Sequence, residues 1–427
     1  MIFSIYIEQK IFFVNVRVGV IYMKFIIWGA GVLGRQCLNG IRYQGKENIE
    51  ICAFIDNNPS LIGTTIADIP ILEPKSVEFI SFDKVIICSQ FSYEHIKRQL
   101  IEDLKISEEK ILCFLMDPLP IRIDVDADNT YLGMLGEFGA EMIAWIPYLS
   151  FLKSRGLKLK TFSRKGSSVY YENISDEHIE VENRYFASTG YGYLKNAEEL
   201  KKDIGLPIFC PCKELRGFKI LINGIEWEIR NFHSEYKTSH LLKPSFPKQE
   251  ILHIKKRAEN YKGIVTINNK SYQNTHIGKV RNHLTKEEVE LLFSFLTKND
   301  YYVVYNDFSE TFKEAYDNVF DSYLPPKHFA RDNPSVLFLS DYSDGTEDKW
   351  DRMQLECWQN SDFVIQHPGG AAAVVELLGI RKFNFMQKGE YQDDLFLSKL
   401  YGGQSDTFYE IRHMIAYIEK EMREGRL

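Results

Sequence analysis

The chain contains 427 residues, which at roughly 100–200 residues per domain is enough for two or three domains. Hydrophobic residues make up 44% of it and charged residues 26%, values typical of a soluble globular protein. The net charge of −7 and the absence of basic runs longer than Lys255-Lys256-Arg257 exclude a dedicated nucleic-acid binder, because neutralising phosphates needs clustered lysine and arginine.

Residues 1–22 are apolar, but Glu8, Lys10 and Arg17 interrupt them. No uncharged run there reaches the roughly 18–20 residues that a membrane span needs. The stretch also has neither the positively charged segment nor the small-residue cleavage site of a signal peptide. Because Met23 directly precedes a strand-like segment, we interpret residues 1–22 as an extension that does not belong to the fold.

A dinucleotide-binding pattern begins at residue 24. Residues 24–28 predict a buried strand, and the next residues follow the pattern GxGxxG at the start of a helix. A second predicted strand, 51–55, ends roughly 20 residues beyond the glycines, where such folds place the acid that bonds a ribose hydroxyl. The predicted cofactor-binding residues of this Rossmann module, assigned to 23–117, are Gly29, Gly31, Gly34 and Asp56.

The module resembles the small Rossmann modules of polysaccharide biosynthesis that precede sugar acyltransferases and some nucleotide-sugar epimerase-like enzymes. The resemblance is carried by the glycines, by FIDNNP at 54–59, by Gly63 and by IPIL at 69–72. It implies NAD(P) or another nucleotide as the ligand, without implying that the module catalyses a reaction. A redox or epimerase site would need a Tyr-x-x-x-Lys pair after the cofactor fold, with the tyrosine as the base. We interpret the spacing of Tyr191 and Lys195 as a coincidence.

Residues 118–130 are predicted to be a linker, because two prolines and four aspartates occur in 116–130 without a helical period. A second α/β unit starts near Tyr131, where a glycine-rich loop precedes a helix at 142–155 and a strand at 157–162.

Two acidic residues stand at the start of this second unit. Glu137 and Glu141 are four residues apart, so an early helix start would point both toward one cleft, and both are candidate bases. The alternative is that they only complement the helix dipole.

A third α/β unit predicts a doubly wound parallel sheet. Its expected elements are strands at 263–267, 301–305, 336–339, 363–365 and 381–386, and helices starting at the Thr285 capping box, covering 353–359, 371–378 and 411–424. The strand at 363–365 leads into QHPGG, where two glycines and the following helix N-terminus suit a phosphate group. The alternative for Gly369 and Gly370 is a tight strand-to-helix connection.

The two later units, assigned to 131–255 and 256–427, resemble the lobes of GT-B glycosyltransferases of bacterial polysaccharide assembly. The resemblance is carried by GEFG at 136–139, by Glu141, by WIPY at 145–148 and by the stretch 357–379. It implies a nucleotide-sugar donor, a glycan or lipid-linked acceptor, and no metal, since Asp393 and Asp394 lie in a late loop and no Asp-x-Asp pair falls within a strand expected here. Its candidate catalytic residues are Glu137, Glu141 and His367, and its candidate donor-binding residues are Asn268, Lys270, Arg281, His367, Gly369, Gly370 and Glu376.

The sequence thus predicts an α/β protein with an N-terminal Rossmann-like module and two Rossmann-like lobes. The predicted function is that of a glycosyltransferase in surface-polysaccharide biosynthesis. The alternatives are an NAD-dependent nucleotide-sugar epimerase or dehydratase and a binding protein without catalysis. The odd number of cysteines, seven in apolar segments, predicts reduced thiols in a cytoplasmic protein. We also expect peripheral association with the inner face of the membrane.

Overall fold

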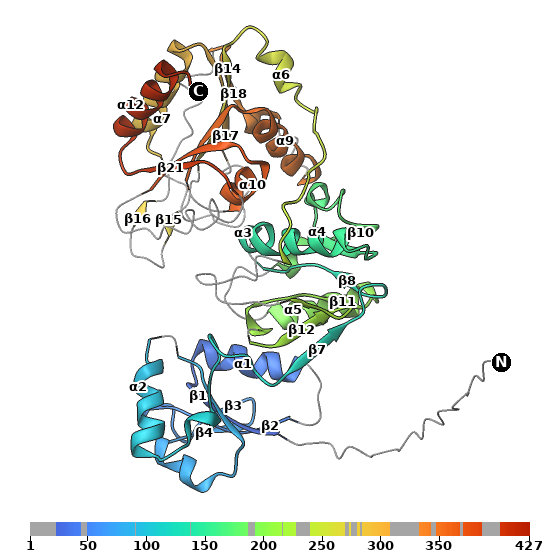
Figure 1. Ribbon diagram of the computed structural model, residues 1–427, viewed down its shortest axis with the longest axis vertical. Coiled ribbons are helices and arrows are strands. Elements are labelled where there is room, and N and C mark those ends of the chain that lie inside the picture. Colours follow the sequence, from blue (N-terminus) through green and yellow to red (C-terminus); the bar gives the residue numbers. More distant parts are fainter. Residues whose placement is uncertain are drawn as a thin grey trace, which may run out of the picture. The chain divides into compact units, whose positions relative to one another are not determined.

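The computed structural model describes residues 23–43, 49–89, 91–136, 138–186, 193–215, 217–227, 240–269, 273–274, 280–281, 284–307, 333–342, 347–367, 370–386 and 402–427. The chain divides into two compact units, Met1–Asp117 and Pro118–Leu427. The predicted α/β fold class is confirmed, because helices connect successive strands of the parallel sheets along the chain (Figure 1).

The N-terminal unit is a six-stranded sheet in the order β3-β4-β2-β1-β5-β6. All neighbours are parallel except the β3–β4 hairpin. Its strands are β1 (Met23–Trp28), β2 (Ile49–Ile55), β3 (Thr65–Ile66), β4 (Ile69–Leu72), β5 (Lys84–Ile87) and β6 (Ile111–Cys113). Its helices are α1 (Val32–Tyr43) and α2 (Tyr93–Arg98), which the π-helical turn η2 (Gln99–Asp103) continues, and the 3₁₀ turns η1 (Pro74–Phe79) and η3 (Glu108–Lys110).

Two of the three glycines after β1 are required by the fold itself. Gly29 has a φ of +110°, and a Cβ there would lie 2.7 Å from the backbone oxygen of Cys88. A Cβ at Gly34 would lie 1.9 Å from the backbone oxygen of Gly29. By contrast, a Cβ at Gly31 would meet no atom within 4 Å, so nothing in the unit itself demands glycine there.

The C-terminal unit begins with a lobe built on two sheets, which we call the first lobe. Its four-stranded sheet is parallel and has the order β10-β9-β8-β11, and a three-stranded sheet has the order β13-β12-β7. The predicted linker contains β7, which pairs in parallel with β12. The strands are β7 (Arg122–Val125), β8 (Tyr131–Leu132), β9 (Lys160–Arg164), β10 (Glu177–Val181), β11 (Ile208–Phe209), β12 (Lys219–Ile222) and β13 (Ile225–Trp227). The helical elements are α3 (Phe138–Ala140), the π-helical turn η4 (Glu141–Trp145), α4 (Ile146–Ser154) and α5 (Tyr193–Ile204), with 3₁₀ turns η5 (Ser168–Tyr170), η6 (Asn183–Tyr185) and η7 (Lys213–Leu215).

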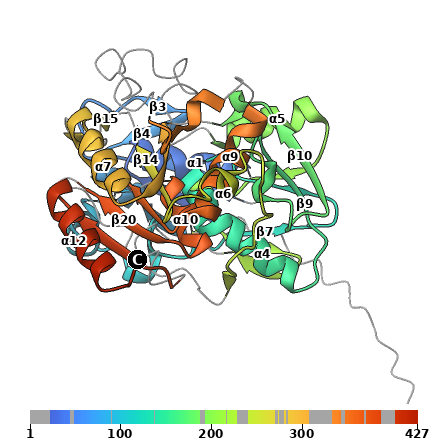
Figure 2. The same ribbon diagram turned by 90° about the horizontal axis from the view of Figure 1, so that it is seen from above.

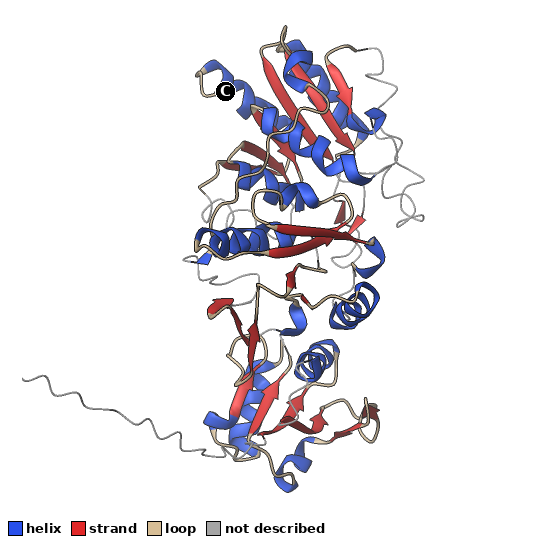
Figure 3. Ribbon diagram, turned by 90° about the vertical axis from the view of Figure 1, so that its right-hand side faces the viewer, coloured by secondary structure: helices blue, strands red, loops and turns tan. Residues whose placement is uncertain are grey.

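The second lobe is a six-stranded parallel sheet in the order β18-β17-β14-β19-β20-β21, whose strands lie side by side in Figure 3. Its first strand is therefore in the middle, as in doubly wound nucleotide-binding folds. The strands are β14 (Gly263–Asn269), β17 (Tyr301–Asp307), β18 (Val336–Phe338), β19 (Phe363–Gln366), β20 (Arg381–Phe385) and β21 (Ser405–Phe408), beside a small hairpin of β15 (Gln273–Asn274) and β16 (Val280–Arg281). The helices are α6 (Ile254–Arg257), α7 (Lys286–Lys298), α9 (Glu347–Asn360), α10 (Gly370–Leu378) and α12 (Ile411–Arg423), with the 3₁₀ turn η11 (Leu339–Tyr342).

Alternate residues of β14 face two different helix layers. Val265 and Ile267 pack with α7 and α12, whereas Ile264 packs with α6 and α9 on the other side (Figure 2). The predicted Thr285 capping box is confirmed, and Thr285 accepts a hydrogen bond from the Glu288 backbone N–H at 3.2 Å. The sheet is thus buried on both faces, which explains the continuous apolar runs that predicted its strands.

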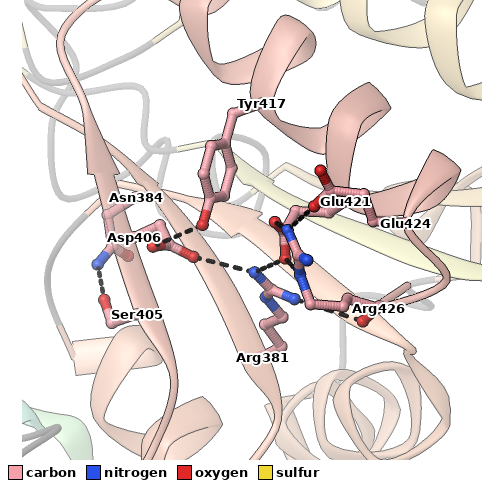
Figure 4. Close-up of polar contacts among 8 residues, drawn as sticks. All are labelled: Arg381, Asn384, Ser405, Asp406, Tyr417, Glu421, Glu424 and Arg426. Carbon is pink, nitrogen blue, oxygen red and sulfur yellow. Dashed lines mark hydrogen bonds and ion pairs between the residues drawn. The ribbon is translucent and has the colours of Figure 1, made fainter.

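A charged cluster fixes the last helix to the sheet (Figure 4). Arg381 of β20 donates to Glu421 of α12 at 2.7 Å and to Asp406 of β21 at 3.3 Å. Arg426 also pairs with Glu421. Hydrogen bonds from Arg426 and then Arg381 lower the pKa of the Glu421 carboxyl from 4.5 to about 2.

We expect this cluster to make the stability of the protein sensitive to acid. Because the folded-state pKa of Glu421 is depressed, its contribution is fully present above pH 4.5 and is lost as the pH falls toward 2. Replacing Glu421 by glutamine should therefore lower the free energy of unfolding at pH 7, and the difference from wild type should shrink between pH 4.5 and 2 in urea titrations. Glu419→Gln, at an exposed position of the same helix, is the control. An equal loss for Glu421→Gln at every pH would contradict the assignment.

Candidate functional site

The strand order of the second lobe's sheet reverses between β14 and β19, and we call the carboxyl ends of these two strands the crevice. The chain continues from β14 to β17 on one side of the sheet and from β19 to β20 on the other. In doubly wound folds, ligands bind outside the carboxyl ends of two neighbouring strands that are connected in this way. Asn268 near the end of β14 is in register with Gln366 at the end of β19. Both side chains are buried.

A row of buried amides crosses four strands at this level. Asn306 of β17 donates to Asn268 at 2.9 Å, and Asn268 donates to Gln366 at 3.1 Å. Gln366 donates to Asn384 of β20 at 3.3 Å, and Asn384 donates to Ser405 at 2.7 Å. Each amide donates toward β21, so the bonds polarise one another and hold the strand ends together.

Side chains of helix α9 form hydrogen bonds with this row of amides. Trp358 donates its indole N–H to Asn268 at 3.1 Å. With its amide oriented to satisfy both neighbours, Gln354 accepts from Asn306 at 3.0 Å and donates to Asp351 at 3.3 Å. A hydrogen-bonded path thus links the crevice strands to Asp351.

The structure brings together the two glycine loops that the sequence singled out in different lobes. A Cβ on Gly370, the first residue of α10, would lie 2.8 Å from the Phe138 ring and 3.2 Å from the Gly139 backbone nitrogen. Helix α10 accordingly packs against α3 and η4 of the first lobe. Glycine at 370 is what permits this close approach of the two helix starts.

Glu141 lies in the first turn after α3, with its side chain 1% exposed. The Tyr171 hydroxyl donates a hydrogen bond to its Oε1. Burial raises the pKa of Glu141 to about 7, although the Arg164 charge and the Tyr171 bond act in the opposite direction, and Asp351 adds to the rise. A carboxyl with this pKa exchanges protons near neutral pH, as a general base requires.

Arg164 and Asp351 join the two lobes beside Glu141. Asp351 of α9 accepts a hydrogen bond from Ser167 at 2.6 Å and forms an ion pair with Arg164 at 3.6 Å. The Arg164 guanidinium lies over the Phe138 ring at 4.4 Å. These residues were missed by the sequence analysis, because neither belongs to a glycine loop or a motif.

Two predicted residues of the second lobe are buried in different surroundings. His367 follows β19 at the crevice and is 7% exposed. Glu376 of α10 is fully buried and forms an ion pair with Lys382 of β20 at 2.7 Å. The carboxylate of Glu376 therefore has a cation inside the lobe, and its part in donor binding stays a prediction.

Several other predicted residues lie outside the part of the chain that the structure describes. These are Glu137, Lys270 and Gly369, and for Arg281 only the backbone, in β16, is described. Among the described residues, no three metal-ligating side chains come together. Within the same residues, no helix has both the length and the apolar character of a membrane span.

In the N-terminal unit, Asp56 is hydrogen-bonded to the glycine loop. Its Oδ2 accepts a hydrogen bond from the Ala30 backbone N–H at 2.8 Å, and its Oδ1 accepts from Asn58 at 2.9 Å. The predicted residues Gly29, Gly31, Gly34 and Asp56 thus meet at the carboxyl ends of β1 and β2. Asp56 is partly exposed, and its role in binding a ligand stays a prediction.

Comparisons with known proteins match different parts of the chain. A family described as C2185-like, N-terminal, matches residues 21–112. No curated protein matches the sequence.

Among solved structures, the chain is similar to ADP-heptose LPS heptosyltransferase II of E. coli, at 9% identity and a TM-score of 0.41, over 70% of this chain and 100% of that one. It is also similar to the UDP-GlcNAc 2-epimerase of Methanocaldococcus jannaschii, at 11% identity and a TM-score of 0.34, over 70% and 92% of the two chains. A shorter similarity, to UDP-D-quinovosamine 4-dehydrogenase of Vibrio fischeri, has 26% identity and a TM-score of 0.18, over 22% and 75% of the two chains.

Proposed function

We propose that this chain is a glycosyltransferase that moves a sugar from a nucleotide-sugar donor to a glycan or lipid-linked acceptor in surface-polysaccharide biosynthesis. The observation that carries the proposal is the meeting of Gly370 and Gly139 at the starts of two helices from two parallel-sheet lobes. Glu141, a buried carboxyl with a pKa of about 7, follows two residues after Gly139. The proposed anion site and the proposed base therefore both belong to the elements that meet at the contact between the lobes.

The start of α10 suits the diphosphate of a nucleotide-sugar. Its first N–H groups lack partners within the helix, the helix dipole favours an anion, and its first turn contains no acidic residue. In transfer, the bond between the anomeric carbon and the diphosphate breaks, and the nucleoside diphosphate leaves with the electron pair. The N–H groups of α10 stabilise the charge that develops on it. We assign Asn268, Lys270, Arg281, His367, Gly369, Gly370 and Glu376 to this donor side.

Glu141 is the proposed base. It removes the proton of the acceptor hydroxyl while the oxygen forms the new bond to the anomeric carbon. Glu137 and His367 are the other candidates, and His367 lies at the carboxyl end of β19 where functional residues of such sheets gather. We place the reaction in the cytoplasm, at the inner face of the membrane.

The test is turnover of nucleotide-sugars by the full chain. We expect release of nucleoside diphosphate from one member of a panel of UDP-, GDP-, ADP- and dTDP-sugars, and stabilisation by the matching free nucleotide in thermal unfolding. Glu141→Gln and Gly370→Ala should each reduce turnover. If no nucleotide-sugar is bound or turned over, the proposal is wrong.

The rate should depend on pH through Glu141. Because a base must be ionised to accept a proton, kcat/KM should rise with pH around a midpoint of about 7 and level off above it. The rise should be absent in the residual activity of Glu141→Gln. A wild-type profile that is flat from pH 5.5 to 8.5 would remove Glu141 from the mechanism.

A nucleotide site in the N-terminal unit is a second, separate proposal. It is favoured by the open space at Gly31, where the fold itself does not require glycine. Gly31→Trp should fill this space and abolish binding of NAD or of a UDP-sugar to the unit, measured by calorimetry, while the thermal unfolding midpoint stays unchanged. Binding that persists in this variant would place the ligand elsewhere. Redox or epimerase turnover by the chain would support the alternative function, that of an NAD-dependent nucleotide-sugar epimerase or dehydratase.

A further inference from the structure

One arginine acts electrostatically on two carboxyl groups that come from different lobes. Arg164 ends β9, and its Nε donates to Ser167 Oγ at 2.8 Å. Its terminal nitrogen lies 3.6 Å from Asp351 of α9, in the second lobe. The same positive charge favours the ionised form of Glu141 in the first lobe. Any contact that draws Arg164 toward Asp351 therefore acts on Glu141.

Few charged groups act on the ionisation of Glu141. The groups that face Glu141 from the surrounding elements are Arg164, Asp351, Tyr170, Tyr171 and Cys210. Burial raises the pKa of both tyrosines and of the cysteine, so these three are neutral near pH 7. Among the described residues, Arg164 is thus the cation and Asp351 the anion that act on this acid.

Two contacts hold the arrangement in place. Ser167 donates to Asp351 at 2.6 Å, so the second lobe is attached to the first at this point. The Tyr171 hydroxyl donates to Glu141, and both side chains are buried. Asp351 is itself linked through Gln354 to the amide row of the crevice. The proposed base and the proposed donor side are therefore physically connected.

We propose that Tyr171 and Asp351 are positioning residues for Glu141, Tyr171 by holding its carboxylate and Asp351 by competing for Arg164 when the lobes are in contact. The inference rests on the proposed function only in naming Glu141 as the base. While the lobes are in contact, Asp351 competes for Arg164, and Glu141 is a stronger base than it would be if Arg164 interacted with Glu141 alone. Separation of the lobes frees Arg164 and weakens the base.

Two substitutions should move the titration of Glu141 in opposite directions. Asp351→Asn keeps an oxygen that accepts from Ser167 but removes the competing charge, so Glu141 should ionise about one pH unit lower, a roughly tenfold change in its ionised fraction below the midpoint. Tyr171→Phe removes a donor to the carboxylate, so Glu141 should ionise at higher pH by a similar amount. Tyr170→Phe is the matched control, since this neighbouring buried hydroxyl has no hydrogen-bond partner within the described part of the chain.

The experiment is an infrared difference titration of the full chain without substrate. The protonated carboxyl band of Glu141 is identified by its loss in Glu141→Gln. We expect its midpoint to fall in Asp351→Asn, to rise in Tyr171→Phe and to stay unchanged in Tyr170→Phe, with the midpoint of kcat/KM following in each. Ser167→Ala leaves every charge in place but removes the hydrogen bond to Asp351, so it should lower the midpoint of Glu141 less than Asp351→Asn does. Ser167→Ala takes the place of Asp351→Asn in the test if Asp351→Asn does not fold.

The outcomes separate this inference from the proposed function. Unchanged midpoints in Asp351→Asn and Tyr171→Phe, or shifts in the same direction, would overturn the inference. Shifts as expected in the infrared titration without any nucleotide-sugar turnover would support the positioning roles and reject the glycosyltransferase.

Discussion

Glu141→Gln should lower nucleotide-sugar turnover by about 10²- to 10⁴-fold, the usual contribution of a general base. The substitution keeps the shape of a side chain that is 1% exposed, and the amide oxygen can still accept the hydrogen bond from Tyr171. KM for the donor should change little, because the start of α10 and the crevice strands are untouched. Steady-state kinetics on the substrate identified in the nucleotide-sugar panel measures both quantities.

The same variant should be more stable than wild type at alkaline pH. The pKa of Glu141 is raised from 4.5 to about 7 in the folded state, so ionising it costs stability that grows between these pH values. Removing the charge should therefore recover up to roughly 3 kcal/mol above pH 7 and little below pH 4.5. Glu214→Gln, at another fully buried acid of the first lobe, is the kinetic control and should leave turnover unchanged. Equal turnover losses in both variants would mean that the effect is structural.

Lys382→Met should destabilise the protein by about 3–5 kcal/mol, because it breaks a buried ion pair by removing one of the two charges. Lys382 and Glu376 are both fully buried and 2.7 Å apart, and the Glu376 carboxylate lies directly against Gly403. Water cannot replace the lost partner at such a site. Urea unfolding followed by tryptophan fluorescence measures the loss.

The double variant Lys382→Met with Glu376→Leu should recover most of the loss, since both charges of the buried pair are then replaced by apolar side chains. Lys286→Met is the control, because the Lys286–Glu290 pair is a surface i,i+4 pair with 61% of the lysine side chain exposed. We expect it to change stability by about 0.5 kcal/mol or less. A single variant at 382 that is as stable as this control would contradict the buried ion pair.

Most elements of the second lobe could be predicted, because its strands are apolar on both faces. The run at 363–365 became β19, and the helix predicted for 371–378 became α10, which ends at Leu378 and is followed by Gly379 with a φ of +76°. By contrast, β21 was not predicted, since Ser405–Phe408 is short and only half buried and carries no apolar run. Similarly, β7 lies in a segment whose aspartates suggested a linker.

The candidate site was only partly accessible from the sequence. Glycine spacing identified Gly370 and the loop before Glu141, because backbone turns and close approaches restrict residue type locally. Asp351 and Ser167, however, are separated by 184 residues, and their contact arises only when the two lobes pack together. The amide row was likewise hidden, since single buried amides on separate strands form no local pattern.

The measurement that tests the central claim most directly is release of nucleoside diphosphate from the nucleotide-sugar panel, comparing wild type with Glu141→Gln. The proposed function predicts that one nucleotide-sugar is turned over by the wild-type chain and that the glutamine variant binds it but turns it over at least about 10²-fold more slowly. Absence of turnover with every donor, or equal turnover by the two proteins, would contradict it.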